Sequence, residues 1–409
     1  MTTQATFTDI LEASKVIKQH LEPTPLIHSS ILSSLYDCDI SLKLDNLHVT
    51  GSFKERGVIY KLSKLSPEER KKGVIATSAG NHAQALAYHA QKMQIPATIV
   101  MPETAPFVKI INTEKYGAKV ILHGNTLDDA FKYTKKIIEE EDRVLVHPYD
   151  DPYIVAGQGT MACEIFADKA NHDFDNLIVP IGGGGLISGI AIATKELAPN
   201  CKVVGVESEM YPSAYQSIHH QEIHCKGISL ADGIAVKKPG KMNLKSIESL
   251  VEEILIVDEL AIEKAILSLS IDQKIIAEGA GAAGLASLIK YPERFRGKKV
   301  CLVICGGNID RRVLSSIFLR GLAREGRMVR LRIQIIDAPG QLALISKIIA
   351  GEKANIIEVQ HKRLLEEITA RQASLDVVME TKGLDHSMRI IALLEEAGFN
   401  CTLKHEIAQ

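Results

Sequence analysis

The chain has 409 residues, of which 46% are hydrophobic and 24% charged, so it is long enough for two or three globular domains with a large core. The formal net charge is −2 and the basic residues are scattered, which argues against nucleic acid as a partner. The seven cysteines are odd in number and irregularly spaced, a pattern typical of reduced thiols rather than of disulfides or a zinc site.

The start of the chain lacks the features of a signal peptide, because Met1–Ile10 has neither a basic start nor an apolar centre. No uninterrupted apolar stretch reaches the length of a membrane span. We therefore expect a soluble protein of the cytoplasm that has no membrane partner.

Short apolar runs alternate with longer amphipathic runs from about Ser41 to Arg320. The expected strands are Gly73–Thr77, Ala97–Met101, Ala118–Leu122, Val144–Val146, Leu177–Pro180, Lys202–Val206 and Val300–Ile304. The expected helices include Ala83–Gln94, Thr126–Glu141, Leu186–Leu197 and Ile262–Asp272. Several strands are rich in β-branched residues with little polar alternation, as in strands covered on both faces. This order predicts an α/β fold with mostly parallel sheets.

The pattern changes after residue 320. A basic stretch bounded by glycines, 321–328, is suited to a linker. Beyond it we expect strands at Val329–Ile335, Asn355–His361, Ile368–Met379 and Phe399–Lys404, and helices at Leu342–Ala350 and Ser387–Glu396. The order βαββαβ is compatible with the split-βαβ group of folds. Residues 329–409 are therefore expected to form a separate domain.

Lys54 lies in the sequence Thr50-Gly51-Ser52-Phe53-Lys54-Glu55-Arg56-Gly57. Two interpretations stand side by side. Ser52 can simply cap a helix that begins at this point. Alternatively, the apolar Phe53 beside Lys54 can disfavour its ammonium form, which makes the neutral amine available for Schiff-base chemistry.

A second polar loop follows, Ser78-Ala79-Gly80-Asn81-His82-Ala83-Gln84. Ser78 or Asn81 can cap a helix that begins near His82. Hydroxyl, amide and backbone N–H groups at a helix N-terminus also form a good site for a carboxylate. A histidine at such a place is more often a structural hydrogen-bond partner, so we do not expect His82 to be the catalytic base.

Four consecutive glycines, Gly182 to Gly185, stand between an apolar strand and a helix that begins at Leu186. A strand-to-helix turn without side chains exposes backbone N–H groups at the positive helix end, where a phosphate binds well. A tight turn with positive φ is the simpler explanation, but such a turn usually needs fewer glycines. Neither the P-loop nor the dinucleotide fingerprint is present.

Together these motifs resemble the fold-type II pyridoxal-phosphate enzymes, and most closely the threonine dehydratases, also called threonine ammonia-lyases. The resemblance covers almost the whole chain. It is carried by Ser52–Gly57, Ser78–Gln84, Gly182–Gly185 and Cys305-Gly306-Gly307-Asn308. The C-terminal segment, with Asp337-Ala338-Pro339-Gly340-Gln341-Leu342 after its first strand, resembles an ACT regulatory domain.

The resemblance implies a fold of two open, mostly parallel sheets with flanking helices, and pyridoxal 5′-phosphate as the cofactor. Residues 1–320 would form the catalytic domain, with a small subdomain at about 50–152. Lys54 would hold the cofactor as a Schiff base and then act as the base on the substrate α-carbon. The expected cofactor-binding residues are Phe53, Lys54, Asn81, Gly182, Gly183, Gly184, Gly185, Leu186 and Cys305. The expected residues for the substrate carboxylate are Ser78, Ala79, Gly80, Asn81 and His82.

Cys305 takes the position that faces the pyridine nitrogen in this family. A thiol, with a reference pKa of about 8.5, is a poor proton donor compared with the carboxylate partner of other pyridoxal-phosphate folds. The ring is therefore expected to be a weaker electron sink, which suits loss of the β-hydroxyl over transamination. The implied reaction converts L-threonine to 2-oxobutanoate and ammonia, and L-serine to pyruvate as a secondary activity.

The nearest competing function is that of a serine racemase, or of a dehydratase for serine or hydroxyaspartate. The racemase uses a serine as its second acid-base group where this chain has Ala79, and a methyl group cannot move protons. Its divalent-cation site needs Glu207 and an acidic residue six positions later, where this chain has Ser213. We therefore expect no metal site of that type. An amino-acid sensor without catalysis and a nucleotide-binding protein are alternatives of other classes.

The ACT-like segment implies regulation. Its strand-to-helix turn, with Asp337, Gly340 and Leu342 as the expected regulatory residues, commonly helps to form an amino-acid site between copies. We expect isoleucine or valine as the effector and a homodimer or homotetramer as the assembly; a purely oligomerising role is the alternative. Isoleucine biosynthesis is the expected setting, and threonine degradation fits the same residues.

Overall fold

The computed structural model describes residues 4–167, 173–363 and 371–404. The chain divides into two compact units, Met1–Ile309 and Asp310–Gln409. The boundary falls about ten residues before the one expected from the sequence, because helix α15 (Arg311–Arg324) belongs to the second unit. Each unit has its own sheet and core, so each is described by itself.

A six-stranded sheet forms the centre of the larger part of the first unit, and its strands run in the order β1-β2-β10-β7-β8-β9. Its strands are β1 (Leu26–His28), β2 (Asp39–Lys43), β7 (Asn176–Pro180), β8 (Lys202–Ser208), β9 (Glu253–Val257) and β10 (Lys299–Val303). Apart from the antiparallel β1–β2 pair, the neighbouring strands are parallel. Strands β7 and β10 are almost wholly buried, as expected for strands covered on both faces.

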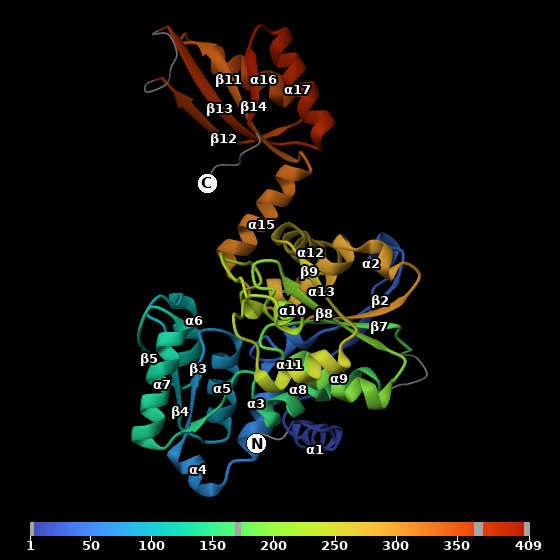
Figure 1. Ribbon diagram of the computed structural model, residues 1–409. Coiled ribbons are helices and arrows are strands. Elements are labelled where there is room, and N and C mark those ends of the chain that lie inside the picture. Colours follow the sequence, from blue (N-terminus) through green and yellow to red (C-terminus); the bar gives the residue numbers. More distant parts are fainter. Residues whose placement is uncertain (1–3, 168–172, 364–370, 405–409) are drawn as a thin grey trace. The chain divides into compact units, whose positions relative to one another are not determined.

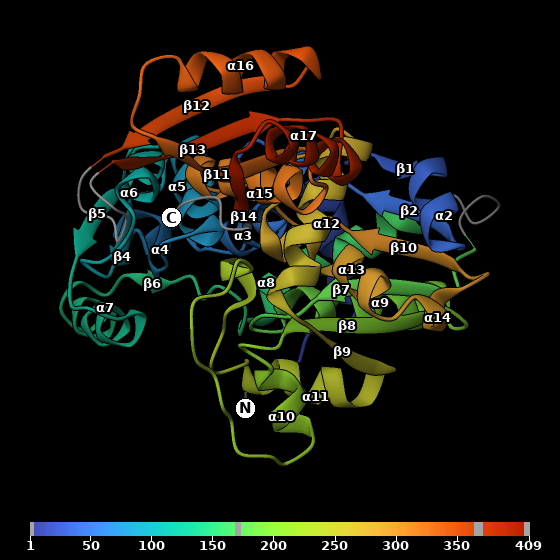
Figure 2. The same ribbon diagram turned by 90° about the horizontal axis from the view of Figure 1, so that it is seen from above.

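A second, four-stranded parallel sheet has the order β5-β4-β3-β6. Its strands are β3 (Val74–Thr77), β4 (Ala97–Met101), β5 (Lys119–Leu122) and β6 (Val144–Leu145). Figures 1 and 2 both show this sheet with helices α4 to α7 as a lobe beside the six-stranded sheet. A core of its own, with Val74, Leu86 and Ile99 fully buried, holds this lobe together.

Helices flank both sheets. They are α1 (Phe7–Ile17), α2 (Ser30–Tyr36), α3 (Lys54–Ser63), α4 (Pro67–Lys72), α5 (Asn81–Lys92), α6 (Phe107–Glu114), α7 (Leu127–Glu141), α8 (Pro152–Ile165), α9 (Gly185–Leu197), α10 (Ser213–Ile218), α11 (Lys241–Leu250), α12 (Glu259–Asp272), α13 (Gly279–Lys290) and α14 (Pro292–Phe295), with 3₁₀ turns η1 (Asp45–Leu47) and η2 (Asp232–Ile234). Local sequence fixes several starts: Thr126 and Asp129 form a capping box on α7.

The expected α/β fold is confirmed, and all seven strands expected before residue 320 are present within one or two residues. Strands β1, β2 and β9 were not expected. Strand β1 has only three residues, and polar side chains alternate along β2. Strand β9 lies between two helices without a glycine or proline to mark its ends. These short strands are defined by their hydrogen bonds to neighbouring strands and not by a pattern in their own sequence.

The second unit contains β11 (Met328–Ile336), α16 (Gln341–Gly351), β12 (Asn355–Lys362), β13 (Gln372–Glu380), α17 (Leu384–Glu396) and β14 (Asn400–Lys404). Its antiparallel sheet has the order β12-β13-β11-β14, the arrangement of a split βαβ fold. The first half of the linker expected at 321–328 is helix, since α15 continues to Arg324. Residues 368–370 of the expected third strand lie outside the described residues.

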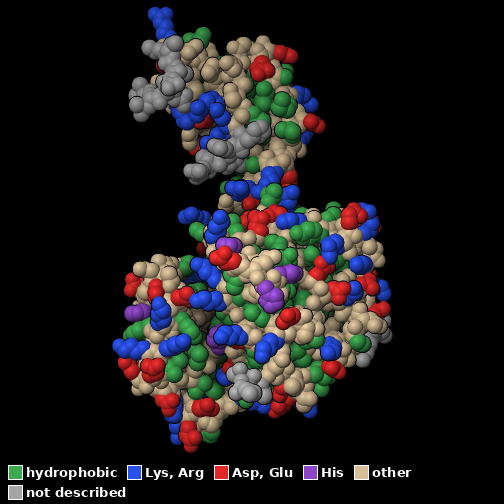
Figure 3. Space-filling view, in the orientation of Figure 1, with side chains coloured by type: hydrophobic (Ala, Val, Ile, Leu, Met, Phe, Trp, Pro, Cys, Tyr) green, Lys and Arg blue, Asp and Glu red, His purple; other side chains and the backbone are tan. Residues whose placement is uncertain are grey.

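The surface carries both signs of charge. On the face in Figure 3, Lys and Arg side chains are interspersed with Asp and Glu, in keeping with the net charge of −2. Within the part of the chain that the structure describes, no helix is both long and apolar enough to cross a bilayer.

Candidate active site

Lys54 is the first residue of helix α3. Its Nζ donates a hydrogen bond to the carbonyl oxygen of Pro148 at 2.8 Å and lies 4.9 Å from the centre of the Phe53 ring. Burial lowers the pKa of Lys54 to about 8. A substantial fraction of the amine is therefore neutral near physiological pH, as Schiff-base chemistry requires.

The start of α3 is held by backbone contacts and not by a capping side chain. The N-cap is Phe53, so the expected cap by Ser52 is wrong. Phe53 N–H donates to the carbonyl of Cys305 at 3.0 Å, and Gly307 N–H donates to Gly51 at 2.9 Å. Ser52 Oγ is buried, and no described residue offers it a hydrogen-bond partner. The lysine is thus placed by an antiparallel contact with the segment 305–307.

The Ser78–His82 loop leads from β3 into α5, which begins at Asn81. Gly80 is the N-cap, and neither Ser78 nor Asn81 caps the helix with its side chain. Ser78 Oγ instead accepts a hydrogen bond from Gly80 N–H at 3.2 Å. Ser78, Ala79, Gly80 and Asn81 are partly exposed, so this helix N-terminus presents N–H groups where an anion can approach.

His82 is buried and its Nε2 is 2.9 Å from the carbonyl oxygen of Val146. Burial, and then the nearby Lys54 ammonium, lower the pKa of His82 to about 3. The imidazole is therefore neutral and donates to the carbonyl. This geometry agrees with a structural role, because the nitrogen that could accept a proton, Nδ1, is enclosed by protein.

Asn81 belongs to a polar network that the sequence did not reveal. Its Nδ2 donates to Glu278 Oε1 at 2.6 Å, and its Oδ1 accepts from Asn308 Nδ2 at 2.8 Å. Asn308 Nδ2 also donates to the carbonyl of Thr50 at 2.7 Å. The network fixes the orientation of the Asn81 amide and leaves its second N–H available for a ligand oxygen.

Glu278 is only 4% exposed and precedes helix α13. Burial, and then the Asp232 carboxylate, raise the pKa of Glu278 to about 7. The residues around it are small by necessity, since a Cβ at Gly306 would lie 2.2 Å from Glu278 Oε1. In the sequence, the two glycines of Gly279-Ala280-Gly281 are the feature that could have drawn attention to Glu278. They mark a close approach of two chain segments, because a Cβ at Gly281 would lie 2.4 Å from the Gly306 oxygen.

The four glycines form the turn between strand β7 and helix α9. Gly184 has φ +87 and is the N-cap of α9. A Cβ at Gly183 would lie 2.1 Å from the Tyr149 ring. Asn243 Nδ2 donates to the carbonyls of Gly183 at 2.8 Å and Tyr149 at 3.0 Å. Two residues missed from the sequence, Tyr149 and Asn243, therefore hold the turn in place.

The turn and the lysine meet at one point of the chain. Pro148 accepts from Lys54, and its neighbour Tyr149 packs against Gly183 and Gly185. Leu186, expected to take part in the site, is the second residue of α9 and is 5% exposed. The structure thus brings the amine and the N–H groups of the glycine turn to either side of Pro148–Tyr149.

Cys305 is the second residue after strand β10 and is 2% exposed. Burial, and then the nearby Glu278 carboxylate, raise the pKa of Cys305 well above its ordinary value. The thiol is therefore neutral throughout the physiological range. This supports the interpretation of Cys305 as a partner that does not place a charge beside a ring nitrogen.

These residues fit pyridoxal phosphate. The glycine turn offers N–H groups to a phosphate, Lys54 offers a partly neutral amine, and Ser52 Oγ is a buried hydroxyl without a described partner. Phe53 and the neutral Cys305 supply surroundings for an aromatic ring. When loaded, the protein would hold the phosphate at Gly182–Gly185 and the aldehyde carbon at Lys54.

The position considered for a divalent cation is occupied by a helix cap. Glu207 accepts hydrogen bonds from the N–H groups of Ala214 at 2.8 Å and Tyr215 at 2.9 Å. Ser213 Oγ donates to the carbonyl of Val236. Burial raises the pKa of Glu207 to about 8. Across the described ranges, no group of three or more His, Cys, Asp or Glu side chains is arranged to hold a metal ion.

The expected regulatory residues lie at one turn of the second unit. Asp337 follows strand β11, and its Oδ1 is paired with Arg363 Nε at 3.0 Å. Gly340, with φ +93, is the N-cap of α16, and Leu342 in its first turn is 43% exposed. The turn therefore presents a polar and an apolar side chain together, but its role stays a prediction.

Comparison with known proteins agrees with pyridoxal phosphate as the cofactor. Residues 17–306 match the profile described as "Pyridoxal-phosphate dependent enzyme". An L-threonine ammonia-lyase of Thermotoga maritima is 43% identical over 397 residues, which are 96% of this chain and 98% of that protein.

Two solved structures resemble the catalytic part. A serine racemase from Dictyostelium discoideum is 35% identical with a TM-score of 0.70, over 75% of this chain and 100% of that one. The processed form of threonine deaminase isoform 2 from Solanum lycopersicum is 30% identical with a TM-score of 0.71, over 78% of this chain and 90% of that one. The chain belongs to the family of pyridoxal-phosphate dependent enzymes.

Proposed function

We propose that this protein is an ammonia-lyase that converts L-threonine to 2-oxobutanoate and ammonia, with L-serine as a secondary substrate. The observation that carries the proposal is Lys54, a partly buried amine whose pKa is lowered to about 8 and which donates to Pro148, the residue before the Tyr149 that packs against the glycine turn. The full-length similarity to an L-threonine ammonia-lyase supports threonine as the substrate.

Each part of the site has one task in this reaction. When bound, pyridoxal phosphate supplies the electron sink for the negative charge at the substrate α-carbon. Lys54 accepts the α-proton, because its neutral form is well populated near pH 8. The N–H groups at the start of α5 bind and orient the substrate carboxylate.

Elimination is favoured over transamination by the neutral partner at the ring. Cys305 keeps its proton, since burial raises the pKa of its thiol, and it is too weak an acid to protonate a ring nitrogen. The negative charge at the α-carbon would therefore be less stabilised and be relieved by loss of the β-hydroxyl, which takes up a proton and leaves as water. The enamine product tautomerises to an imine, and hydrolysis of the imine gives the 2-oxo acid and ammonia.

Racemisation is the second candidate, because a serine racemase is 35% identical over the catalytic part. It needs an acid-base group on the face opposite Lys54, and the loop carries Ala79 at the position considered. The methyl group cannot exchange a proton. Lys54 is then the only side-chain base proposed for the α-carbon, and one-sided proton transfer preserves discrimination between L and D substrates.

The second unit is proposed to regulate the enzyme as an ACT-like domain. Its βαββαβ order and the turn at Asp337, Gly340 and Leu342 support this role. Isoleucine or valine is the proposed effector, and a homodimer or homotetramer in the cytoplasm is the proposed form. Coupling requires two states that differ in effector affinity.

The test is formation of 2-oxobutanoate from L-threonine by the purified, cofactor-loaded chain, compared with L-serine, D-serine and hydroxyaspartate. We expect threonine to give the highest kcat/KM, D-serine to give no product, and isoleucine to shift the threonine saturation curve. Conversion of L-serine to D-serine at a rate matching elimination would contradict the lyase proposal. Saturation curves that neither isoleucine nor valine changes would contradict the regulatory one.

A further inference from the structure

Glu55 follows Lys54 in helix α3 and is fully buried. Its Oε1 accepts hydrogen bonds from Thr50 N–H at 2.5 Å and Thr50 Oγ at 2.8 Å. Its Oε2 lies 2.7 Å from Nε2 of His89, whose side chain is 2% exposed. One carboxylate therefore has three partners, and two of them belong to the residue that begins the loop leading to Lys54.

His89 brings a second part of the site into contact with this carboxylate. It lies in α5, about two turns after Asn81. Helix α5 is a continuous element, so the bond from His89 to Glu55 fixes α5 against the first turn of α3. The amine of Lys54 and the N–H groups near Asn81 are thereby held at a set spacing.

The loop is fixed on its other side by the segment that carries Cys305. Phe53 N–H donates to Cys305, and Asn308 Nδ2 donates to the carbonyl of Thr50. Thr50 thus joins Asn308 through its carbonyl and Glu55 through its N–H and hydroxyl. Loss of the Glu55 contacts would leave the loop attached on one side only.

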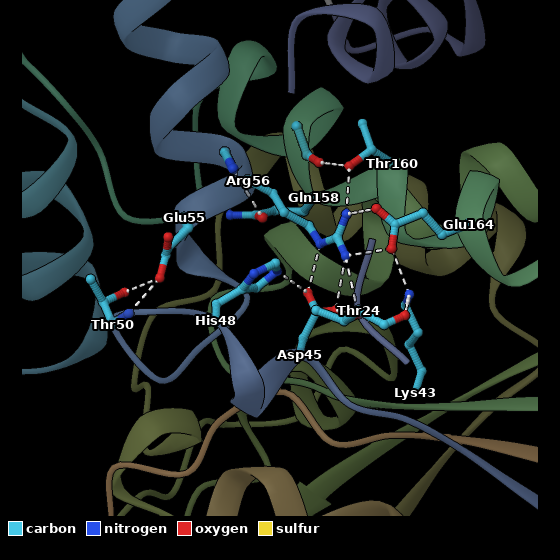
Figure 4. A network of polar contacts seen from close by, with 12 residues as sticks. Thr24, Lys43, Asp45, His48, Thr50, Glu55, Arg56, Gln158, Thr160 and Glu164 are labelled. Carbon is cyan, nitrogen blue, oxygen red and sulfur yellow. Dashed lines mark hydrogen bonds and ion pairs between the residues drawn. The ribbon is translucent and has the colours of Figure 1, made fainter. Parts of the chain in front are cut away.

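Arg56 makes a contrasting contact in the same turn. Figure 4 shows Glu55 directed to Thr50 on one side of α3 and the guanidinium of Arg56 directed to Asp45 and Glu164 on the other. The Arg56 guanidinium donates to four side chains, those of Thr24, Asp45, Thr160 and Glu164. It is a poor test residue, because its removal leaves unpaired charge. Glu55 has fewer partners, and they lie in the loop at Thr50 and in helix α5 at His89.

A buried carboxylate is a costly way to join two helices, since an apolar contact of similar size is often as stabilising or more so. Hydrogen bonds, unlike apolar contacts, fix the orientation of their partners. The three bonds that Glu55 accepts fix both the loop at Thr50 and helix α5 at His89. The pKa of Glu55 is nonetheless kept below its ordinary value, because the bonds from His89 and Thr50 outweigh the effect of burial. The Glu55 carboxylate is therefore ionised, and both of its oxygens accept hydrogen bonds.

We propose that Glu55 and His89 are positioning residues that set the spacing between the Lys54 amine and the substrate-carboxylate loop at Asn81. The inference rests on the proposed role of Lys54. Displacement of a reacting group by about 1 Å can reduce the rate about 100-fold, so a loose loop would lower catalysis without removing any group that touches the substrate.

The test compares Glu55→Ala, Glu55→Gln and His89→Phe in the full chain. Glutamine keeps an oxygen for Thr50 and an amide toward His89, whereas phenylalanine keeps the ring volume and removes the hydrogen bond. Asp129→Ala is the matched control, because Asp129 makes the same two contacts with Thr126, at 3.2 Å and 2.7 Å, on exposed helix α7.

Two readouts are taken well below each variant's melting temperature. The first is the rate at which added pyridoxal phosphate becomes fixed to Lys54 by borohydride in the cofactor-free protein, followed by peptide mass. The second is kcat and KM for threonine. We expect Glu55→Ala and His89→Phe to slow fixation and lower kcat by about 10-fold to 100-fold, Glu55→Gln to recover most of both, and Asp129→Ala to change neither.

Wild-type fixation rates in Glu55→Ala and His89→Phe, with a lower melting temperature alone, would overturn the proposal and leave the pair as a packing contact. An equal loss of fixation rate and kcat in Glu55→Gln and Glu55→Ala would also overturn the proposal, because the hydrogen bonds that glutamine retains would then have no effect. The fixation readout needs no turnover. A protein inactive on threonine would therefore contradict the proposed function, while the fixation rates would still test the positioning role of Glu55 and His89.

Discussion

Lys54 and Glu278 carry opposite charges when ionised, and burial favours the neutral form of both. It lowers the pKa of Lys54 to about 8 and raises that of Glu278 to about 7. With the neutral thiol of Cys305 nearby, the site contains few fixed charges of its own. A bound phosphate or carboxylate would therefore meet backbone N–H groups with few charged side chains competing for them.

The raised pKa of Glu278 makes stability depend on pH. The folded state holds a proton that the unfolded chain releases near pH 4.5, so the contribution of Glu278 to stability is greatest below that value and is lost as pH rises through about 7. Glu278→Gln keeps an oxygen for Asn81 and has no proton to lose. We expect its melting temperature to fall less than that of the wild type between pH 5 and pH 8, by several degrees.

The measurement is a set of thermal melts of the cofactor-free proteins across that range. Parallel curves for the two proteins would mean that Glu278 titrates at its ordinary value in the folded state. The variant should also retain cofactor binding, because the amide of Asn81 keeps its acceptor.

At the scale of elements, the strand–turn–helix unit at Gly182–Gly185 is the most constrained part of the site. Gly184 has positive φ, and a Cβ there would lie 2.9 Å from Cβ of Asn243, the residue that holds the turn. A side chain would therefore meet both backbone strain and a clash. A side chain at Gly184 would therefore displace both the turn and Asn243.

Gly184→Ala is expected to weaken pyridoxal phosphate binding at least about 10-fold and to destabilise the fold by more than about 1 kcal/mol. Gly297→Ala is the control, since Gly297 also has positive φ, at +68, with nothing within 4 Å of its Cβ position. It should cost about 1 kcal/mol and leave cofactor affinity unchanged. Cofactor affinity is measured by titration of the cofactor-free proteins. Equal affinity in both variants would contradict a phosphate-binding site at this turn.

Most elements could be predicted because their signals are local. Alternation of buried strands with amphipathic helices, and the period-two pattern of β11, depend only on neighbouring residues. The helix caps were less predictable: Ser52 and Ser78 have the chemistry of caps, yet Phe53 and Gly80 occupy those positions. Long-range contacts with the segment 305–307 decided the first of these starts.

The site divides in the same way. The amine, the loop and the glycines are motifs within single stretches of chain. Glu278, Asn243 and Tyr149 act across long sequence separations, on Asn81 and on the glycine turn. Glu278 is marked only by the glycines that follow it, and nothing next to Asn243 or Tyr149 in the sequence marks their role. Glu55 and His89 are likewise joined only by folding.

For the whole molecule, the two units differ in architecture. The first has two mostly parallel sheets, and the second has an antiparallel sheet with helices α16 and α17. All of the residues proposed for catalysis and cofactor binding fall in the first unit, and Asp337, Gly340 and Leu342 fall in the second. Catalysis and regulation are therefore proposed for separate units of one chain.

The first unit also contains a buried set of charged groups behind the lysine. Arg56 bonds to Asp45 and Glu164, and Lys43 bonds to Glu164 at 2.5 Å, as Figure 4 shows. The Arg56 guanidinium outweighs the effect of burial and keeps the pKa of Asp45 well below its ordinary value. This set joins α3, α8 and η1, so the helix that begins with Lys54 has a rigid support.

The central claim is that Lys54 is the residue that carries the cofactor. The most direct test is borohydride reduction of the cofactor-loaded wild-type chain, followed by digestion and peptide mass measurement. The label is expected on Lys54 alone, and Lys61 of the same helix, which is paired with Asp151 at 2.6 Å, should stay unmodified. A label on Lys61 or any other lysine, or no label in a protein that binds pyridoxal phosphate, would contradict the account.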